Sequence, residues 1–438
     1  MTRYTSVTEA DQREMLATVG VASVDDLFAD VPSELRLRRP LALAEGMSEQ
    51  EVFTELAGLA ARNVSVEDEI SFLGAGMYDT YVPALVDSII SRSEFLTPYT
   101  PYQPEVSQGG LQAMFEYQTA ISELTGLPVS NASVYEGPSA VAAAGYLAKL
   151  HNGRSRFVVS EGVHPHAIES LETLAHGWEM EVERVALDNG ATPMPAVDEQ
   201  VSAVVVAQPN FLGAVERIEP IVEAAHAAGA LVICAADPIP LGLLQAPGAQ
   251  GVDIVVGEGQ TLGNRLDYGG PSFGFFAVTE SLMRRMPGRI AGRTRDLDGR
   301  TGYVLTLQTR EQHIRREKAT SNICTAQALN ALAGIVYLSW LGREGLIELT
   351  ELLVQRTAYA RTRLASIPGV ELAHHQPVVR EFPVRITGRL DAVLEHCYAS
   401  GINPGYRLSA DELLVAITER RTRADIDRLA TAIEEALS

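Results

Sequence analysis

Val201-Ser-Ala-Val-Val-Val206, Ala230-Leu-Val-Ile-Cys234 and Val252-Asp-Ile-Val-Val256 are short apolar runs rich in β-branched residues. A segment with helical character, 220–228, separates the first run from the second. Continuous apolar runs of this length are typical of strands that are buried on both faces. Strands that alternate with helices predict βαβ units, and hence a mostly parallel sheet covered by helices on both sides.

The same alternation continues on both sides of this stretch. Further strands are predicted at 156–159 and 272–278, and further helices at 110–125, 138–150 and 165–176. An almost uninterrupted apolar helix, 326–341, is expected to be buried and to link two domains. We therefore predict one large α/β domain that covers residues 67–340.

Different patterns flank this domain. Residues 1–66 show helical periodicity at 9–19 and 49–62 and no strand, which predicts an N-terminal helical arm. Residues 341–438 predict a smaller α+β domain, with strands at 378–386 and 413–418 and a last amphipathic helix from Thr422.

Composition excludes several classes of protein. The net charge of −21 argues against a nucleic-acid partner, because phosphate binding needs an excess of cations. No apolar run approaches the roughly 18 residues of a membrane span, and the N-terminus lacks an apolar signal segment. Cys234, Cys324 and Cys397 have no short spacing that indicates disulfides or zinc, so no metal is expected. We expect a soluble, cytoplasmic protein.

Two loops before helices have residues suited to binding. Glu136-Gly-Pro-Ser139 opens a helix, whose free backbone N–H groups favour an anion such as a phosphate. The alternative is an ordinary capped helix. Glu161-Gly-Val-His164-Pro-His166 follows a strand, and His164 is placed to stack on a flat cofactor ring or to serve a structural role. The spacing of the two histidines, without a third ligand nearby, makes zinc a poor candidate.

Three other segments are notable for proline, glycine or charge. Residues 97–105 hold Tyr99 and Tyr102 between three prolines, as a rigid binding surface or a stiff linker. Residues 253–263 are rich in glycine, but their spacing differs from a dinucleotide fingerprint. Residues 284–318 contain ten basic and four acidic side chains. This basic segment is suited to a phosphate or an acidic partner protein, or is simply a solvated face.

Five stretches together resemble one family, the glycine-decarboxylating P-protein of the glycine cleavage system. They are 72–83, 98–111, 209–213, 255–260 and 307–325. The likeness covers nearly the whole chain and fits the N-terminal half of P-protein, or the first subunit where the protein is split into two chains. It differs at Thr80 and Pro138, where relatives often have histidine and alanine. The resemblance implies a pyridoxal-phosphate-dependent transferase-like architecture of fold type I.

The family's cofactor is held as a Schiff base on a lysine of the other half or subunit. The equivalent position here is Gln260, and a glutamine cannot form that bond. The chain has only two lysines, Lys149 and Lys318, with none between them. The resemblance therefore implies no catalytic residue of this kind here and a pyridoxal 5'-phosphate covalently held by the partner chain.

The resemblance also implies partners and a shared site. The partners are a second P-protein subunit in an α2β2 heterotetramer, glycine, and the lipoyl group of an acidic H-protein. Residues expected to reach the partner's cofactor across the subunit interface are Tyr99, Tyr102, Gln103, Thr320 and Ser321. Two alternatives stay open: a silent scaffold that only stabilises its partner, and a self-sufficient enzyme that uses Lys318. The sequence also leaves open whether a vestigial site near Ser139 and His164 holds any ligand.

Overall fold

A computed structural model of the chain describes residues 6–270 and 272–438. Its contacts separate two compact units, Met1–Val64 and Ser65–Ser438. In the first unit, α1 (Glu9–Val19) and α2 (Glu49–Ala60) form where helices were predicted, each opened by a reciprocal capping box at Thr8 or Ser48. Neither helix buries a residue. Residues 6–64 contain no strand, as predicted.

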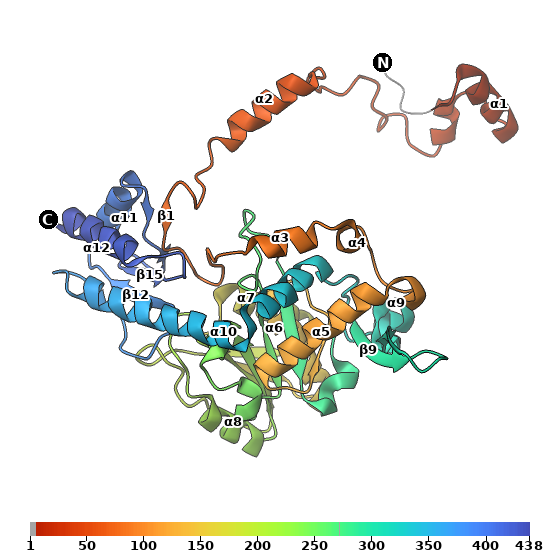
Figure 1. Cartoon of the computed structure of the whole chain (residues 1–438). Coiled ribbons are helices and arrows are strands. Elements are labelled where there is room, and N and C mark those ends of the chain that lie inside the picture. The colour runs from red at the N-terminus through yellow and green to blue at the C-terminus, as the bar shows by residue number, and fades with distance from the viewer. Residues whose placement is uncertain (1–5, 271) are drawn as a thin grey trace. The chain divides into compact units, whose positions relative to one another are not determined.

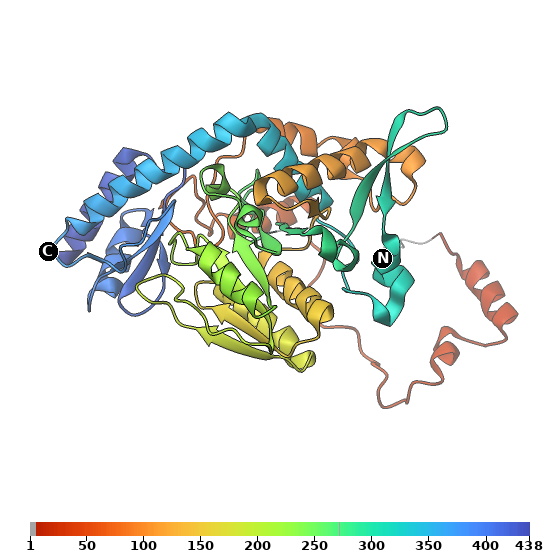
Figure 2. The ribbon, with the colours of Figure 1, turned by 90° about the horizontal axis from the view of Figure 1, so that it is seen from below.

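The second unit is built on a seven-stranded sheet (Figures 1 and 2). Five neighbouring strands are parallel, whereas β8 runs antiparallel to both of its neighbours. In spatial order the strands are β2 (Val129–Ser130), β8 (Gly274–Val278), β7 (Ile254–Glu258), β6 (Leu231–Ala236), β5 (Val201–Gln208), β3 (Arg156–Ser160) and β4 (Glu181–Val185). The three opening runs of the sequence analysis are thus adjacent central strands.

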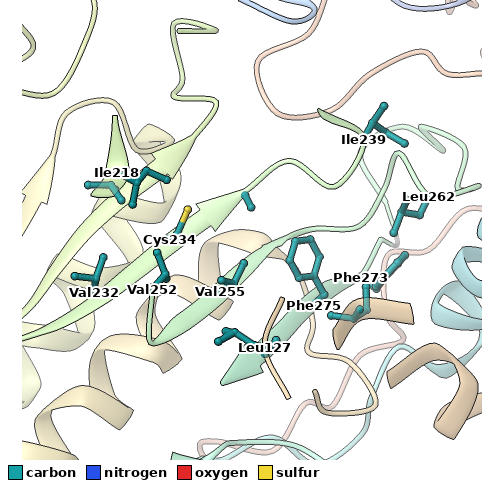
Figure 3. Close-up of a cluster of buried hydrophobic side chains, with 14 of the residues drawn as sticks. Leu127, Ile218, Val232, Cys234, Ile239, Val252, Val255, Leu262, Phe273 and Phe275 are labelled. Atoms are coloured by element: carbon teal, nitrogen blue, oxygen red, sulfur yellow. The ribbon is translucent and has the colours of Figure 1, made fainter. Parts of the chain in front are cut away.

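Helices cover both faces of this sheet. Alternate residues of β5 point to opposite faces of the sheet. Val204 packs in a hydrophobic core with helices on one face, and Val205 packs in a second core with helices on the other face. The first set is α5 (Gln108–Thr125), α8 (Ile218–Ala227) and α10 (Ala328–Ala365), and the second is α6 (Gly137–Asn152) and α7 (Pro165–Gly177). Figure 3 shows the first core, where Cys234 and Val255 of neighbouring strands lie side by side and Phe275 of the next strand lies farther along. The predicted doubly covered α/β sheet is confirmed.

Helix α10 connects this sheet with a second one. It contains the predicted apolar helix, is broken at Gly342 (φ 61°, ψ −178°), and continues to Ala365. The second sheet is antiparallel, in the order β11 (Glu371–Leu372), β12 (Glu381–Arg385), β15 (Glu412–Ala416) and β14 (Tyr406–Arg407). It packs with α10, α11 (Leu390–Ala399) and α12 (Arg423–Leu437) in one core. Our domain limits of 66 and 340 stay predictions.

Shorter elements complete the fold. They are β1 (Ile70–Ser71), paired in parallel with β13 (Ile402–Asn403), and helices α3 (Ala84–Ile90), α4 (Ser93–Leu96) and α9 (Gln312–Arg315). The basic segment holds an antiparallel hairpin, β9 (Ile290–Arg295) and β10 (Thr301–Thr306), which packs on α5 and was not predicted. Among the described helices, none is both long and apolar enough to cross a bilayer.

Candidate active site

A cavity of about 570 Å³ lies beyond the carboxyl ends of the parallel strands. The segments that follow β3, β5, β6 and β7 line it, together with the start of α6. This is where ligands bind in open α/β sheets. Arg380 and Glu381 reach the same cavity from the second sheet, more than a hundred residues later in the sequence.

Gln260, placed by resemblance at the lysine position, is completely buried just after β7. Its side-chain oxygen accepts a hydrogen bond from the backbone N–H of Tyr78 at 2.9 Å. Its amide nitrogen donates to the carbonyl oxygens of Tyr78 at 3.0 Å and Asn264 at 2.8 Å. The side chain therefore joins two backbone segments and leaves no group for cofactor attachment. Neither lysine of the chain lines the cavity.

The start of α6, which was expected either to bind an anion or to be an ordinary cap, is capped by carboxylates. Glu136 accepts a hydrogen bond from the N–H of Ser139 at 2.8 Å, and Glu258 accepts one from the N–H of Gly137 at 2.9 Å. A side chain on Gly137 would meet the backbone nitrogen of Glu258 at 3.0 Å, so a larger residue would push the two segments apart. The two carboxylates occupy the backbone donors that a phosphate would need.

His164 lines the cavity, but backbone groups hold both of its ring nitrogens. Nδ1 accepts a hydrogen bond from the N–H of His166 at 3.1 Å, which leaves the proton on Nε2 to donate to the carbonyl oxygen of Ala75 at 2.9 Å. Burial lowers the pKa of His164, so the ring is neutral near pH 7. The ring of Phe211 lies edge-on to it with centroids 5.0 Å apart. These contacts favour the structural role that the sequence left open.

A buried cluster of charges lies at the side of the cavity nearest the second sheet. The guanidinium of Arg380 stacks on the ring of Tyr78, 3.6 Å from its centroid, and forms an ion pair with Asp237. Glu381 accepts hydrogen bonds from the Tyr78 hydroxyl and the Ala75 N–H, both at 2.7 Å. Burial raises the pKa of Asp237, and it raises that of Glu381 to about 7.

Pyridoxal phosphate does not fit this chain's own cavity. The position that the resemblance assigns to the attachment lysine is a hydrogen-bonded glutamine, and carboxylates take up the amides at the start of α6. The one guanidinium lining the cavity is paired with Asp237. A dianionic phosphate placed beside Glu136 and Glu258 would be repelled. The glycine-rich stretch ends at Pro271, which lies outside the described residues.

The residues expected to act across a subunit interface lie away from this cavity. Tyr99 and Tyr102 are 78% and 51% exposed, and Gln103 is exposed beside them. Thr320 and Ser321 are half-buried, and the Ser321 hydroxyl accepts a hydrogen bond from the N–H of Ile323 at 2.9 Å. No described hydrogen bond or ring contact joins Thr320 or Ser321 to the two tyrosines.

Tyr102 instead contacts residues that the sequence analysis did not select. Its hydroxyl accepts a hydrogen bond from Arg289 at 3.2 Å, and its ring lies edge-on to His313 with centroids 5.7 Å apart. Arg289 forms a buried ion pair with Glu311 at 3.6 Å. The Nε of Arg289 and the Oε1 of Glu311 are buried without a hydrogen-bond partner. We call these four residues the Tyr102 cluster. Arg289, Glu311 and His313 lie in the basic segment and Tyr102 in the proline-rich segment 97–105, and no sequence pattern linked the two.

The family model described as "Glycine cleavage system P-protein" matches residues 2–433. The chain belongs to the glycine cleavage system P-protein family. This P-protein chain is 48% identical over 436 residues to a probable glycine dehydrogenase (decarboxylating) subunit 1 from Geobacillus kaustophilus, which covers 97% of each chain. A relative of the same description from Chlorobium phaeobacteroides is 48% identical over 428 residues and covers 96% of each.

Solved structures agree with this assignment. A crystal structure of glycine decarboxylase (P-protein) of the glycine cleavage system, in inhibitor-bound form, superposes with a TM-score of 0.90 at 44% identity and covers 99% of this chain and 100% of the other. A sphingosine-1-phosphate lyase from Burkholderia pseudomallei shares the fold at 14% identity, with a TM-score of 0.61 and coverage of 92% and 93%. These neighbours confirm the predicted fold-type-I architecture.

Proposed function

We propose that this chain is the subunit without the anchoring lysine in a glycine dehydrogenase (decarboxylating), and that it works with a second, lysine-bearing subunit. Membership of the P-protein family supports the activity. Gln260 is the observation that supports a cofactor lysine on the second subunit. Its side chain is fully hydrogen-bonded to backbone at the position where a lysine would be needed. A subunit with this residue depends on another chain for the cofactor.

The proposed reaction divides glycine into two products. The carboxylate leaves as CO₂, and the electron pair of the broken C–C bond forms a bond from the aminomethyl carbon to one sulfur of the oxidised lipoyl arm of an H-protein. The lipoyl S–S bond breaks, and the other sulfur takes a proton to become a thiol. Pyridoxal phosphate, held by the partner subunit in an α2β2 assembly, supplies an electron sink for the carbon that loses CO₂.

The Tyr102 cluster is the proposed contribution of this chain to the partner's site. Its exposed tyrosine presents a hydroxyl held by Arg289, and the rigid segment 97–105 fixes the ring. Arg289 and Glu311 each keep a buried polar atom without a hydrogen bond, which favours a partner group closing over them. Tyr99, Gln103, Thr320 and Ser321 would complete this surface by binding and by excluding water.

Reductive trapping tests the division of labour. Borohydride treatment of the assembled complex, followed by peptide mass analysis, should give a pyridoxyl-lysine on the partner and none on Lys149 or Lys318. Lys318 is exposed and Lys149 donates to the carbonyl of Trp178, so neither is placed to hold the cofactor. A stoichiometric adduct on either lysine would falsify the proposal.

Substitution of Tyr102 separates a shared site from a silent scaffold. Tyr102→Phe removes only the hydroxyl that Arg289 binds, so it should lower kcat of the complex at least tenfold while the melting temperature stays the same. Tyr398→Phe, at a tyrosine that is 53% exposed on α11, is the matched control and should leave kcat unchanged. Wild-type turnover in Tyr102→Phe would support the scaffold alternative.

A further inference from the structure

The cavity of this chain is closed to pyridoxal phosphate, yet it keeps a volume of about 570 Å³, within the range of metabolite sites. We propose that it binds the protonated amino group of a small molecule, an amine or an amino acid, and rejects phosphate esters. This site is separate from the shared site proposed above and does not depend on it.

The charges that line the cavity favour a cation. Four carboxylates reach it, those of Glu136, Asp237, Glu258 and Glu381, against one guanidinium, Arg380. Arg380 pairs with Asp237, whereas no ion pair among the described residues includes Glu136 or Glu258. Both side chains are half-buried, where a carboxylate without a counter-charge is less well solvated than in water, so a bound cation would stabilise them.

The hydrogen bonds of these two carboxylates also leave room for a ligand. Glu136 has one backbone donor, the N–H of Ser139. Glu258 is bonded to the N–H groups of Gly137 and Gln260 and to the Ser272 hydroxyl, all of them neutral donors. Burial raises the pKa of Glu258 against the effect of these three donors, so a positive charge beside the carboxylate would be a further compensation. An ammonium would supply that compensation directly.

A second and independent observation points to a ligand with N–H donors. Thr261 lines the cavity, is only 2% exposed, and its hydroxyl has no hydrogen-bond partner. Buried hydroxyls are normally bonded, so a partner is missing. A primary ammonium carries three donors and no acceptor, and so matches a hydroxyl oxygen and carboxylates together.

The remaining wall is aromatic. Tyr135, His164 and Phe211 line the cavity, and burial lowers the pKa of His164 so that its ring is neutral near pH 7. Ring faces attract ammonium groups and do nothing for phosphate. The cavity thus combines uncompensated carboxylates, a free hydroxyl and aromatic rings, which is the chemistry of an amine site.

Calorimetric titration of the purified full-length chain with methylammonium chloride, and separately with glycine, tests this proposal. We expect saturable binding of at least one of them. Binding of methylammonium identifies a simple amine site, and binding of glycine alone identifies an amino acid site. Pyridoxal phosphate and inorganic phosphate should show none. Glu258→Gln keeps an oxygen for the Gly137 N–H but removes the charge, and should weaken amine binding at least tenfold.

Glu199→Gln, at an exposed carboxylate away from the cavity, is the matched control and should bind as the wild type does. If Glu258→Gln folds poorly, Phe211→Leu replaces it and should weaken binding about threefold, through loss of a ring face. The titrations are repeated with the co-purified complex. If the variants lower the amine affinity of the complex as they lower that of the chain alone, the binding does not arise from a site on the partner. Absence of amine binding, equal affinity in the variants, or binding of phosphate would overturn the inference.

Discussion

Glu381 is a carboxyl group whose protonation is coupled to folding. Burial raises its pKa from 4.5 to about 7, and this effect outweighs the opposing hydrogen bonds from Ala75 and Tyr78 and the charge of Arg380. The folded chain therefore holds a proton on Glu381 at pH values where the unfolded chain has lost it. Its contribution to stability is fully present below about pH 4.5 and declines as the pH rises through 7.

Replacement of this carboxyl group should change how stability depends on pH. In Glu381→Gln the group no longer titrates. The free energy of unfolding of the wild type, minus that of the variant, should therefore be smaller at pH 7.5 than at pH 5, by an amount on the order of 3 kcal/mol. Denaturant unfolding of both proteins at the two pH values measures it. Parallel pH profiles would show that Glu381 is not perturbed by folding.

Among the elements, burial decided which ones could be predicted. The central strands β5, β6 and β7 were predicted because their apolar runs are continuous, and β5 is buried along its whole length. The edge strand β4 and strand β9 were missed because their exposed residues carry charges that hide the period, whereas the uncharged, half-buried β10 has no clear alternation. The approach of Arg380 and Glu381 to the cavity depends on packing between two sheets, which no local pattern contains.

The hairpin changes the interpretation of the basic segment. Arg289 and Arg310 are buried within the fold, so if the basic segment attracts an acidic partner such as an H-protein, exposed residues such as Arg284 and Arg293 must do so. Changing both of these to glutamate should raise KM for the H-protein several-fold and flatten its dependence on salt, because such charges act on encounter. Arg428→Glu on α12 is the control. Unchanged KM at low salt would identify the hairpin as an ordinary solvated surface.

At the scale of the whole molecule, the N-terminal unit exposes apolar side chains that need a covering surface. Val52, Phe53, Leu56 and Leu59 follow a helical spacing on α2 and are 41–74% exposed. We expect them to pack on the second subunit, so that the chain alone self-associates and the co-expressed pair elutes as a heterotetramer. Phe53→Glu with Leu56→Glu should abolish co-elution, whereas Gln50→Glu should preserve it. Normal co-elution of the double variant would contradict this role.

The hydrogen bonds of Gln260 have a consequence for the history of such a chain. A single base change converts a glutamine codon into a lysine codon, so a lysine at this position looks easy to acquire. Lysine, however, has no acceptor for the N–H of Tyr78, and an unsatisfied buried N–H costs about 1–3 kcal/mol. Even then Glu136 and Glu258 would still repel the phosphate. An attachment lysine here would therefore need several further substitutions beside it, and a chain that works with a lysine-bearing subunit, as proposed above, would remain dependent on that subunit.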